Sequence, residues 1–172
     1  MTSPLEAHIR NVPDFPIPGI QFKDITTLLR NGPALHQAID VFVERYKHMQ
    51  IDAVVAIESR GFIFGAPLAY ALGIGLVPVR KIGKLPADTY QVEYALEYGT
   101  ATLEIHKDAF KPGARVVVID DLLATGGTIA AACELVERAG GVVVESAFLI
   151  ELAFLAGRSK LANRAIYTQI TY

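Results

Sequence analysis

The stretch VVVIDDLLATGGT (Val116–Thr128) places a run of β-branched residues directly before two adjacent acids and a glycine-rich turn. A continuous Val/Ile run of this length favours a strand that is buried on both faces of a sheet. A helical pattern follows the turn, so the free backbone N–H groups and the positive dipole end of that helix would face it. The stretch therefore predicts a strand, a phosphate-binding turn and a helix in succession.

The segments on either side of this stretch repeat the alternation of strand and helix. The apolar runs that read as strands cover residues 53–58, 76–81, 115–120 and 142–150, and the helical patterns cover residues 33–49, 61–72 and 127–139. This order predicts an α/β fold with an open, mostly parallel twisted sheet flanked by helices. Ligands of such sheets bind beyond the carboxyl ends of the strands, which is where Asp120 and the turn lie.

Residues 82–106 depart from this alternation. They hold two short aromatic and β-branched stretches around Gly99-Thr100, a pattern typical of a hairpin inserted between two sheet strands. Long insertions at the ligand end of a sheet often act as lids. The sequence therefore predicts a flexible lid hairpin here.

Length and composition favour one domain with a sizeable core, because the chain has 172 residues, 52% of them hydrophobic, and a mean hydropathy of +0.34. So apolar a chain suggests further burial against a partner, and we expect a homo-oligomer. The net charge of −2 argues against a nucleic-acid partner. The lone cysteine, Cys133, forms no intrachain disulfide, which fits a reducing cytoplasm.

One uncharged run, residues 62–79, nearly reaches membrane-spanning length at 18 residues. Two prolines and three glycines break it, so it reads as a buried helix, a Gly-Ile-Gly turn and a strand. The first ten residues include an acid and a proline and have no apolar core, so they do not read as a secretory signal. We therefore expect no association with a membrane.

The two acids, Asp120 and Asp121, narrow the class of ligand. No lysine follows the glycines as in GxxxxGK[ST], and no GxGxxG is present, which disfavours a kinase or a dinucleotide enzyme. A carboxylate repels phosphate but accepts hydrogen bonds from hydroxyls, so the pair suits a ligand such as ribose 5-phosphate. A bound Mg²⁺ would relieve the repulsion between the acids, directly or through water. The alternative is an ordinary strand–turn–helix junction.

With these residues in place, the stretch resembles the 5-phosphoribosyl 1-diphosphate (PRPP) signature of the type I phosphoribosyltransferase family. The leucine pair and ATGGT, together with blocks at residues 14–26, 58–65, 80–86 and 96–99, are similar to the adenine-specific branch of that family in particular. The resemblance covers nearly the whole chain. It implies one phosphoribosyltransferase domain over residues 1–172, with an N-terminal hood (1–32) and a lid (82–106).

The activity that this resemblance implies belongs to purine salvage: PRPP and adenine give AMP and pyrophosphate. The resemblance also implies Mg²⁺ as the cofactor, held mainly by PRPP and water with no direct protein ligand, and a cytoplasmic homodimer. Two rival interpretations stay open. One is transfer to another base, such as a 6-oxopurine. The other is a protein of this fold that binds PRPP as a regulatory ligand and nucleic acid through added segments.

Roles for individual residues also follow from the resemblance. The 5′-phosphate and ribose would be bound by Asp120, Asp121, Ala124, Thr125, Gly126, Gly127 and Thr128. Pyrophosphate would be bound by Ser59, Arg60, Arg80, Lys81 and Lys84, and the Glu58–Ser59 peptide would be cis. Clustered cations past a strand suit a leaving group with several negative charges. A solvated surface is the alternative for the cluster, and a pair with Glu58 is the alternative for Arg60.

Adenine would lie under the hood. Backbone groups of Gln21 and Lys23 would form hydrogen bonds with the edge of the base. Phe22 would shape the pocket, and Leu122 would pack on the opposite face of the ring. Arg60 would lie within reach of the base. The alternative for this block is a Pro-Gly turn that leads into a core strand.

The catalytic residues that the resemblance implies are Glu97, Tyr98 and Asp121. Glu97 would exchange a proton near N7 of the purine, Tyr98 would close over the ribose, and Asp121 would help to stabilise the cationic sugar ring. A surface position on the hairpin is the alternative for Glu97, and Glu104 is a neighbouring candidate for its role.

Overall fold

The computed structural model describes residues 3–96, 99–161 and 163–172. Its centre is a seven-stranded sheet with the order β5-β6-β4-β3-β7-β8-β9. The strands are β3 (Ala53–Ile57), β4 (Gly75–Lys81), β5 (Thr89–Ala95), β6 (Thr100–His106), β7 (Arg115–Leu123), β8 (Val142–Glu151) and β9 (Ile166–Thr171). The five strands from β4 to β9 in this order run parallel, and β6 and β5 continue the sheet antiparallel. The predicted open, mostly parallel sheet is thus confirmed.

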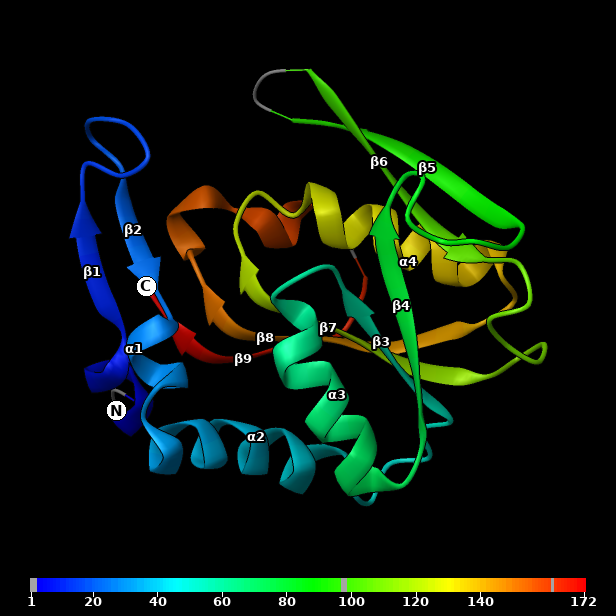
Figure 1. Cartoon of the computed structure of the whole chain (residues 1–172), viewed down its shortest axis with the longest axis horizontal. Coiled ribbons are helices and arrows are strands. Elements are labelled where there is room, and N and C mark those ends of the chain that lie inside the picture. The colour runs from blue at the N-terminus through cyan, green and yellow to red at the C-terminus, as the bar shows by residue number, and fades with distance from the viewer. Residues whose placement is uncertain (1–2, 97–98, 162) are drawn as a thin grey trace.

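Helices cover both faces of this sheet (Figure 1). Helices α2 (Gly32–Tyr46) and α3 (Gly61–Leu72) lie on one face, and α4 (Gly127–Arg138) lies on the other. Each face has its own apolar core, because α2 and α3 pack with one set of sheet residues and α4 packs with the set that alternates with it. All five residues of β3 are buried, as the Val-rich run predicted for a central parallel strand.

The hairpin of β5 and β6 folds over the α4 side of the sheet (Figure 1). The side chain of Arg138 in α4 donates a 3.0 Å hydrogen bond to the carbonyl of Gln91 in β5. The predicted hairpin therefore forms, and it lies against the helix that follows the glycine-rich turn.

The N-terminal residues form a small unit at the β9 side of the sheet (Figure 1). A 3-10 helix, η1 (Pro4–His8), precedes β1 (Arg10–Pro13) and β2 (Gln21–Asp24), which pair antiparallel, and α1 (Thr26–Leu29) follows. The Pro-Gly turn does lead into a strand, but β2 belongs to this two-stranded sheet, so the alternative of a core strand is wrong.

The observed bounds differ from the sequence-based ones at a few points. Strand β7 continues three residues past Asp120, because its pairing with β8 extends to the partners Leu123 and Glu151. Helix α2 ends at Tyr46 rather than at residue 49. The run at residues 62–79 folds as predicted, into α3, a turn at Gly73 and β4. In the part of the chain that the structure describes, no helix is both long and apolar enough to cross a membrane.

Candidate active site

Three cavities adjoin at the carboxyl ends of β3 and β7. The central cavity has a volume of about 420 Å³ and is lined by Ile57, Glu58, Ser59, Arg60, Lys81, Tyr94, Leu103, Asp120, Asp121 and Thr128. The turn cavity, about 170 Å³, is lined by Arg60, Ile129 and most residues from Asp120 to Thr128. The N-terminal cavity, about 410 Å³, is lined by Val12, Phe15, Phe22, Lys23, Asp24, Ile25, Thr26 and Arg60. Cavities at this edge of the sheet agree with the expected ligand position.

The acid pair lies between the central cavity and the turn cavity. Although Asp120 and Asp121 are consecutive residues of a strand, both line both cavities. Asp121 is only 4% exposed, and its Oδ2 lies 2.8 Å from Nε of Arg60. Oδ1 of Asp120 accepts a 2.8 Å hydrogen bond from the backbone N–H of Asp121. Both acids therefore face the same two cavities, although β7 continues past them to Leu123.

Burial sets the charge state of this pair. It raises the pKa of both carboxyls, and for Asp120 the negative charge of Asp121 raises the pKa further. Arg60 opposes the rise at Asp121 because a neighbouring cation favours the ionised form. The two acids are therefore kept from ionising as readily as exposed aspartates, and a ligand that donates hydrogen bonds to them would relieve this cost.

Arg60 reaches Asp121 because α3 begins in contact with β7. A Cβ on Gly61, the first residue of α3, would lie 2.7 Å from the carbonyl oxygen of Ile119, so only glycine allows this approach. The Glu58–Ser59 peptide just before it is cis, as the family resemblance implied. The alternative that Arg60 pairs with Glu58 is wrong, since its carboxylate partner is Asp121.

The glycine-rich turn has the geometry that the sequence predicted. Gly126 has a φ of +82°, a left-handed conformation that favours glycine, and it precedes the first residue of α4. The free N–H groups of α4 therefore open toward the turn cavity. Oγ1 of Thr128 donates a 3.3 Å hydrogen bond to the hydroxyl of Tyr94 on β5.

The three predicted pyrophosphate cations in the segment from Arg80 to Lys84 differ in position. Lys81 lines the central cavity. Arg80 instead holds the Glu58 carboxylate, with Nη2 and Nε at 2.9 and 3.2 Å from its two oxygens, and this pair lowers the pKa of Glu58. Arg80 also donates to the carbonyl of Lys84, and neither residue is among those lining the central cavity. The structure thus brings Ser59, Arg60 and Lys81 to the central cavity, while Arg80 and Lys84 are not among its lining residues.

The N-terminal cavity is lined by apolar side chains with polar groups at one end. The rings of Phe15 and Phe22 meet edge to face, with centroids 5.1 Å apart. The side chain of Lys23 turns away to Tyr172, with Nζ 3.6 Å from the ring centroid, and Gln21 bonds to Asn11. Phe22 and Lys23 thus line this cavity, whereas Gln21 is not among its lining residues. Leu122 lines the adjoining turn cavity.

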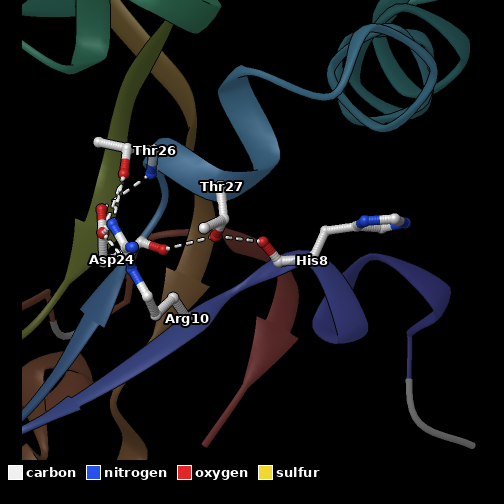
Figure 2. Close-up of polar contacts among 5 residues, drawn as sticks. All are labelled: His8, Arg10, Asp24, Thr26 and Thr27. Carbon is white, nitrogen blue, oxygen red and sulfur yellow. Dashed lines mark hydrogen bonds and ion pairs between the residues drawn. The ribbon is translucent and has the colours of Figure 1, made fainter.

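Asp24, which lines this cavity, is held by several polar contacts (Figure 2). Its carboxylate accepts hydrogen bonds from the backbone N–H and the hydroxyl of Thr26, both 2.9 Å, and forms an ion pair with Arg10 on β1. These donors, the Thr26 amide first, lower the pKa of Asp24 to about 2. Thr27 donates to the carbonyl of His8 at 2.7 Å, while the His8 imidazole points away from the cluster (Figure 2). β1, β2 and α1 are thereby fastened to one another.

The structure describes only one of the lid residues that were considered for proton exchange with the purine or for covering the ribose. Glu97 and Tyr98 lie outside the described residues. Glu104, the neighbouring candidate, is 2% exposed and binds the backbone N–H groups of Lys84 and Leu85 at 2.9 and 2.8 Å. Burial alone would raise its pKa, but these backbone donors outweigh it and hold the pKa below its usual value. Glu104 is therefore an ionised group that anchors the loop after β4.

Replacing Glu104 tests this structural interpretation. Glu104→Ala leaves two partly buried N–H groups without their acceptor, so we expect the free energy of unfolding to fall by about 1–3 kcal/mol. Glu104→Gln keeps an oxygen for these donors and should regain most of that loss, with wild-type kcat. The pKa of Glu104 is lower in the folded state than in the unfolded state. Wild type should therefore be more stable to unfolding than the Gln variant at pH values above the unfolded pKa, and this difference should disappear as pH falls through the folded pKa. Urea denaturation at several pH values measures this, and a large loss of kcat in the Gln variant would instead favour a role in proton transfer.

Tyr94 and Leu103 were not predicted as site residues. Both reach the central cavity because the hairpin folds over α4, and nothing in their local sequence signals this. In the described ranges, no three His, Cys, Asp or Glu side chains gather as a metal-binding group. The carboxylates that line the central cavity are Glu58, Asp120 and Asp121.

Comparison with known proteins gives a consistent result. A family model described as the phosphoribosyl transferase domain matches residues 24–169. An adenine phosphoribosyltransferase from Chloroflexus aurantiacus is 70% identical over 168 residues, which are 98% of this chain and 97% of the relative. The crystal structure of the adenine phosphoribosyltransferase from Thermoanaerobacter pseudethanolicus is 54% identical with a TM-score of 0.94 over 98% of both chains.

A third similar protein is known with ligands. The Saccharomyces cerevisiae adenine phosphoribosyltransferase, complexed with adenine and an imino-altritol bisphosphate, is 44% identical with a TM-score of 0.91 over 96% of both chains. The central sheet flanked by helices agrees with these structural similarities. The chain therefore belongs to the phosphoribosyltransferase family and has its type I fold.

Proposed function

We propose that the central and turn cavities bind PRPP and that the N-terminal cavity binds adenine. The chain is a glycosyltransferase of purine salvage, which transfers the 5-phosphoribosyl group from PRPP to adenine and gives AMP and pyrophosphate. The placement of the acid pair beside the glycine-rich turn carries this assignment of the cavities. A sugar phosphate is a ligand that presents a diol to the acids and a phosphate to the turn at the same time.

The proposed contacts hold both ends of the sugar. Asp120 and Asp121 accept hydrogen bonds from the 2′- and 3′-hydroxyls, and the backbone N–H groups of residues 124–128 and the hydroxyls of Thr125 and Thr128 bind the 5′-phosphate. As the bond between C1 and the diphosphate oxygen breaks, positive charge grows on the ribose ring. Asp121, buried beneath it, then stabilises that charge more strongly than it stabilises the ground state.

The leaving pyrophosphate is stabilised by further groups that line the central cavity. These are the backbone at the Glu58–Ser59 peptide, Arg60 and Lys81. Mg²⁺ bound to the diphosphate supplies further neutralisation of its charge, and Asp120 and Asp121 would hold water ligands of that ion rather than the ion itself. Arg80, tied to Glu58, keeps that carboxylate from repelling the pyrophosphate.

Adenine is proposed to lie in the N-terminal cavity, between Phe22 and Leu122, with backbone groups of Gln21 and Lys23 at its edge. Residues 1–32 would act as a hood over the base, and residues 82–106 as a lid that excludes water from the cationic sugar. The contact between Tyr94 and Thr128 supports the lid, because it joins the hairpin to the phosphate turn. Glu97 and Tyr98, which follow Tyr94 on the chain, are proposed to exchange the proton at N7 and to cover the ribose.

Two lysine substitutions test which of these cations contacts the pyrophosphate. Lys81→Ala should raise the KM for PRPP by about 10-fold, because a charged contact to a phosphate contributes about 1.5–3 kcal/mol. Lys84→Ala is the matched control. It should raise the KM for PRPP by less than about 3-fold, because solvent screens the charge of an exposed lysine. Initial rates at fixed adenine and varied PRPP measure both. A larger effect of Lys84 than of Lys81 would contradict the proposed position of the pyrophosphate.

We further propose a cytoplasmic homodimer and a single domain over residues 1–172. A dimer is supported by apolar side chains on the outer side of α3 and β4, including Ile63, Leu76 and Tyr70, which is 90% exposed. The buried thiol of Cys133 supports a reducing compartment, since it takes no part in a disulfide.

The direct test of the activity is AMP formation from adenine and PRPP, with and without Mg²⁺. We expect AMP and pyrophosphate in equal amounts when Mg²⁺ is present, and a rate lower by at least about 10-fold after chelation. Hypoxanthine and guanine in place of adenine test the rival transfer to a 6-oxopurine. A faster reaction with either base would overturn the assignment of adenine, and binding of nucleic acid without pyrophosphate release would overturn the enzymatic role.

A further inference from the structure

A contact between two backbones lies behind the phosphate turn. A Cβ on Gly157 would fall well within 3.0 Å of the carbonyl oxygen of Ala124 and at 3.1 Å from the amide nitrogen of Gly126. In the opposite direction, a Cβ on Gly126 would fall within 3.0 Å of the carbonyl oxygen of Gly157. Real Cβ atoms do not approach other atoms this closely, so the turn and the Gly157 segment touch through bare main chain.

Gly157 is itself held firmly in place. It begins the 3-10 helix η3 (Gly157–Leu161), whose last residue is buried in the core. The neighbouring Arg158 binds Glu151 at the end of β8 with two hydrogen bonds of 2.6 Å, and Glu151 is only 4% exposed. This pair lowers the pKa of Glu151 and joins η3 to the strand next to β7. The turn therefore rests on a support that is anchored in the sheet.

We propose that Gly157 is a positioning residue for the 5′-phosphate of the substrate, an inference that rests on the proposed function. Gly157 contacts the peptide groups from Ala124 to Gly126, whose N–H groups are proposed to bind the phosphate. Its missing side chain lets η3 press against these peptides and fix the direction of their N–H groups. Binding sites depend on such support, because a displacement of about 1 Å lowers rates by about 100-fold.

The variant Gly157→Ala tests this role. Its methyl group forces the carbonyl of Ala124 to move by about 1 Å to reach an ordinary contact distance. We expect the dissociation constant for ribose 5-phosphate, measured by calorimetry, and the KM for PRPP to rise by about 10-fold to 100-fold. The KM for adenine at saturating PRPP should stay within about 2-fold, since the N-terminal cavity does not include the turn. General loss of structure would not produce this split between the two substrates.

Gly75→Ala, at the start of β4, is the matched control, because a Cβ on Gly75 meets nothing within 4 Å and its φ is not positive. It should bind ribose 5-phosphate like wild type. If Gly157→Ala does not fold, Arg158→Lys tests the same role. Lysine keeps the positive charge next to Glu151 but loses the bidentate hydrogen bonds of the guanidinium. This variant should weaken ribose 5-phosphate binding by about 3-fold and leave the KM for adenine unchanged.

The possible outcomes separate this inference from the proposed function. Wild-type protein that neither binds ribose 5-phosphate nor makes AMP would refute the proposed function. Active wild type together with a folded Gly157→Ala variant of unchanged ribose 5-phosphate affinity would overturn the role of Gly157 alone. Equal losses of affinity for ribose 5-phosphate and adenine would also overturn it, because they would indicate a general structural effect.

Discussion

Replacing Asp120 and Asp121 together by asparagine should raise the KM for PRPP by about 100-fold or more, because each charge-assisted hydrogen bond contributes about 1.5–3 kcal/mol. Asparagine keeps the size of the side chain and one acceptor oxygen, so the change removes charge with little disturbance of packing. Arg60 loses its partner, but its side chain is 48% exposed and stays hydrated. The double substitution should therefore weaken binding of the sugar without disrupting the fold.

Stability should change in the opposite direction to activity. Because burial raises the pKa of both acids in the folded state, ionised Asp120 and Asp121 oppose folding at neutral pH. This cost is absent below the unfolded pKa near 4 and grows as pH rises toward the raised folded values. The double Asn variant should thus have a Tm at neutral pH equal to or above that of wild type.

The pH dependence of PRPP binding tests the same pair. The diol needs ionised acceptors, so kcat/KM for PRPP in wild type should fall as pH falls through the raised pKa values, which lie above the range of exposed carboxyls. This acid limb should be absent or displaced in the double Asn variant. Asp108→Asn, at an exposed position, is the matched change of charge and should leave both KM and the limb unchanged. Wild-type KM in the double variant would contradict the proposed diol contacts, and a large fall in its Tm would contradict the expected cost of burying the two charges.

Arg60→Ala should lower kcat/KM for PRPP by about 1,000-fold. The guanidinium pairs with Asp121 and is proposed to stabilise the negative charge of the leaving pyrophosphate, so its loss removes both interactions. Arg60 lines the central, turn and N-terminal cavities alike. Its removal also leaves Asp121, 4% exposed, without the cation that opposes the rise of its pKa. The acid limb of the pH profile should therefore move to higher pH in this variant.

Arg60→Lys should recover part of the activity, because it returns the charge without the geometry of the guanidinium. Arg30→Ala, which removes an exposed arginine on the N-terminal unit, should leave kcat/KM within about 2-fold. Steady-state rates over pH measure all three. If Arg60→Ala kept kcat/KM within about 3-fold of wild type, or if its acid limb did not move, Arg60 would have no role at the reacting centre.

Much of the fold could be predicted because its central strands are continuous Val/Ile runs. The strand VVVID and the helix that begins at Gly127 follow from local sequence. Strand β9, with the sequence IYTQIT, is an edge strand with partly polar residues and gives no such signal. The end of β7 was placed too early for a related reason: Asp120 and Asp121 look like a strand end, but pairing with β8 carries the strand on to Leu123.

The site could be predicted where neighbouring residues act together, as in the acid pair and the turn. It could not be predicted where the partners are distant in the chain. Arg80 is tied to Glu58, 22 positions earlier, and Tyr94 reaches Thr128 only because the hairpin folds over α4. The support of the turn by Gly157 is also a tertiary contact, and a lone glycine in a loop does not reveal it.

The most direct measurement is a crystal structure of the protein with AMP bound. The 5′-phosphate should accept hydrogen bonds from the backbone N–H groups of residues 124–128, and the 2′- and 3′-hydroxyls should both donate to carboxylate oxygens of Asp120 and Asp121 within about 3 Å. A nucleotide whose phosphate occupies the turn while its hydroxyls lie out of hydrogen-bonding reach of both acids would contradict the proposed binding of the sugar.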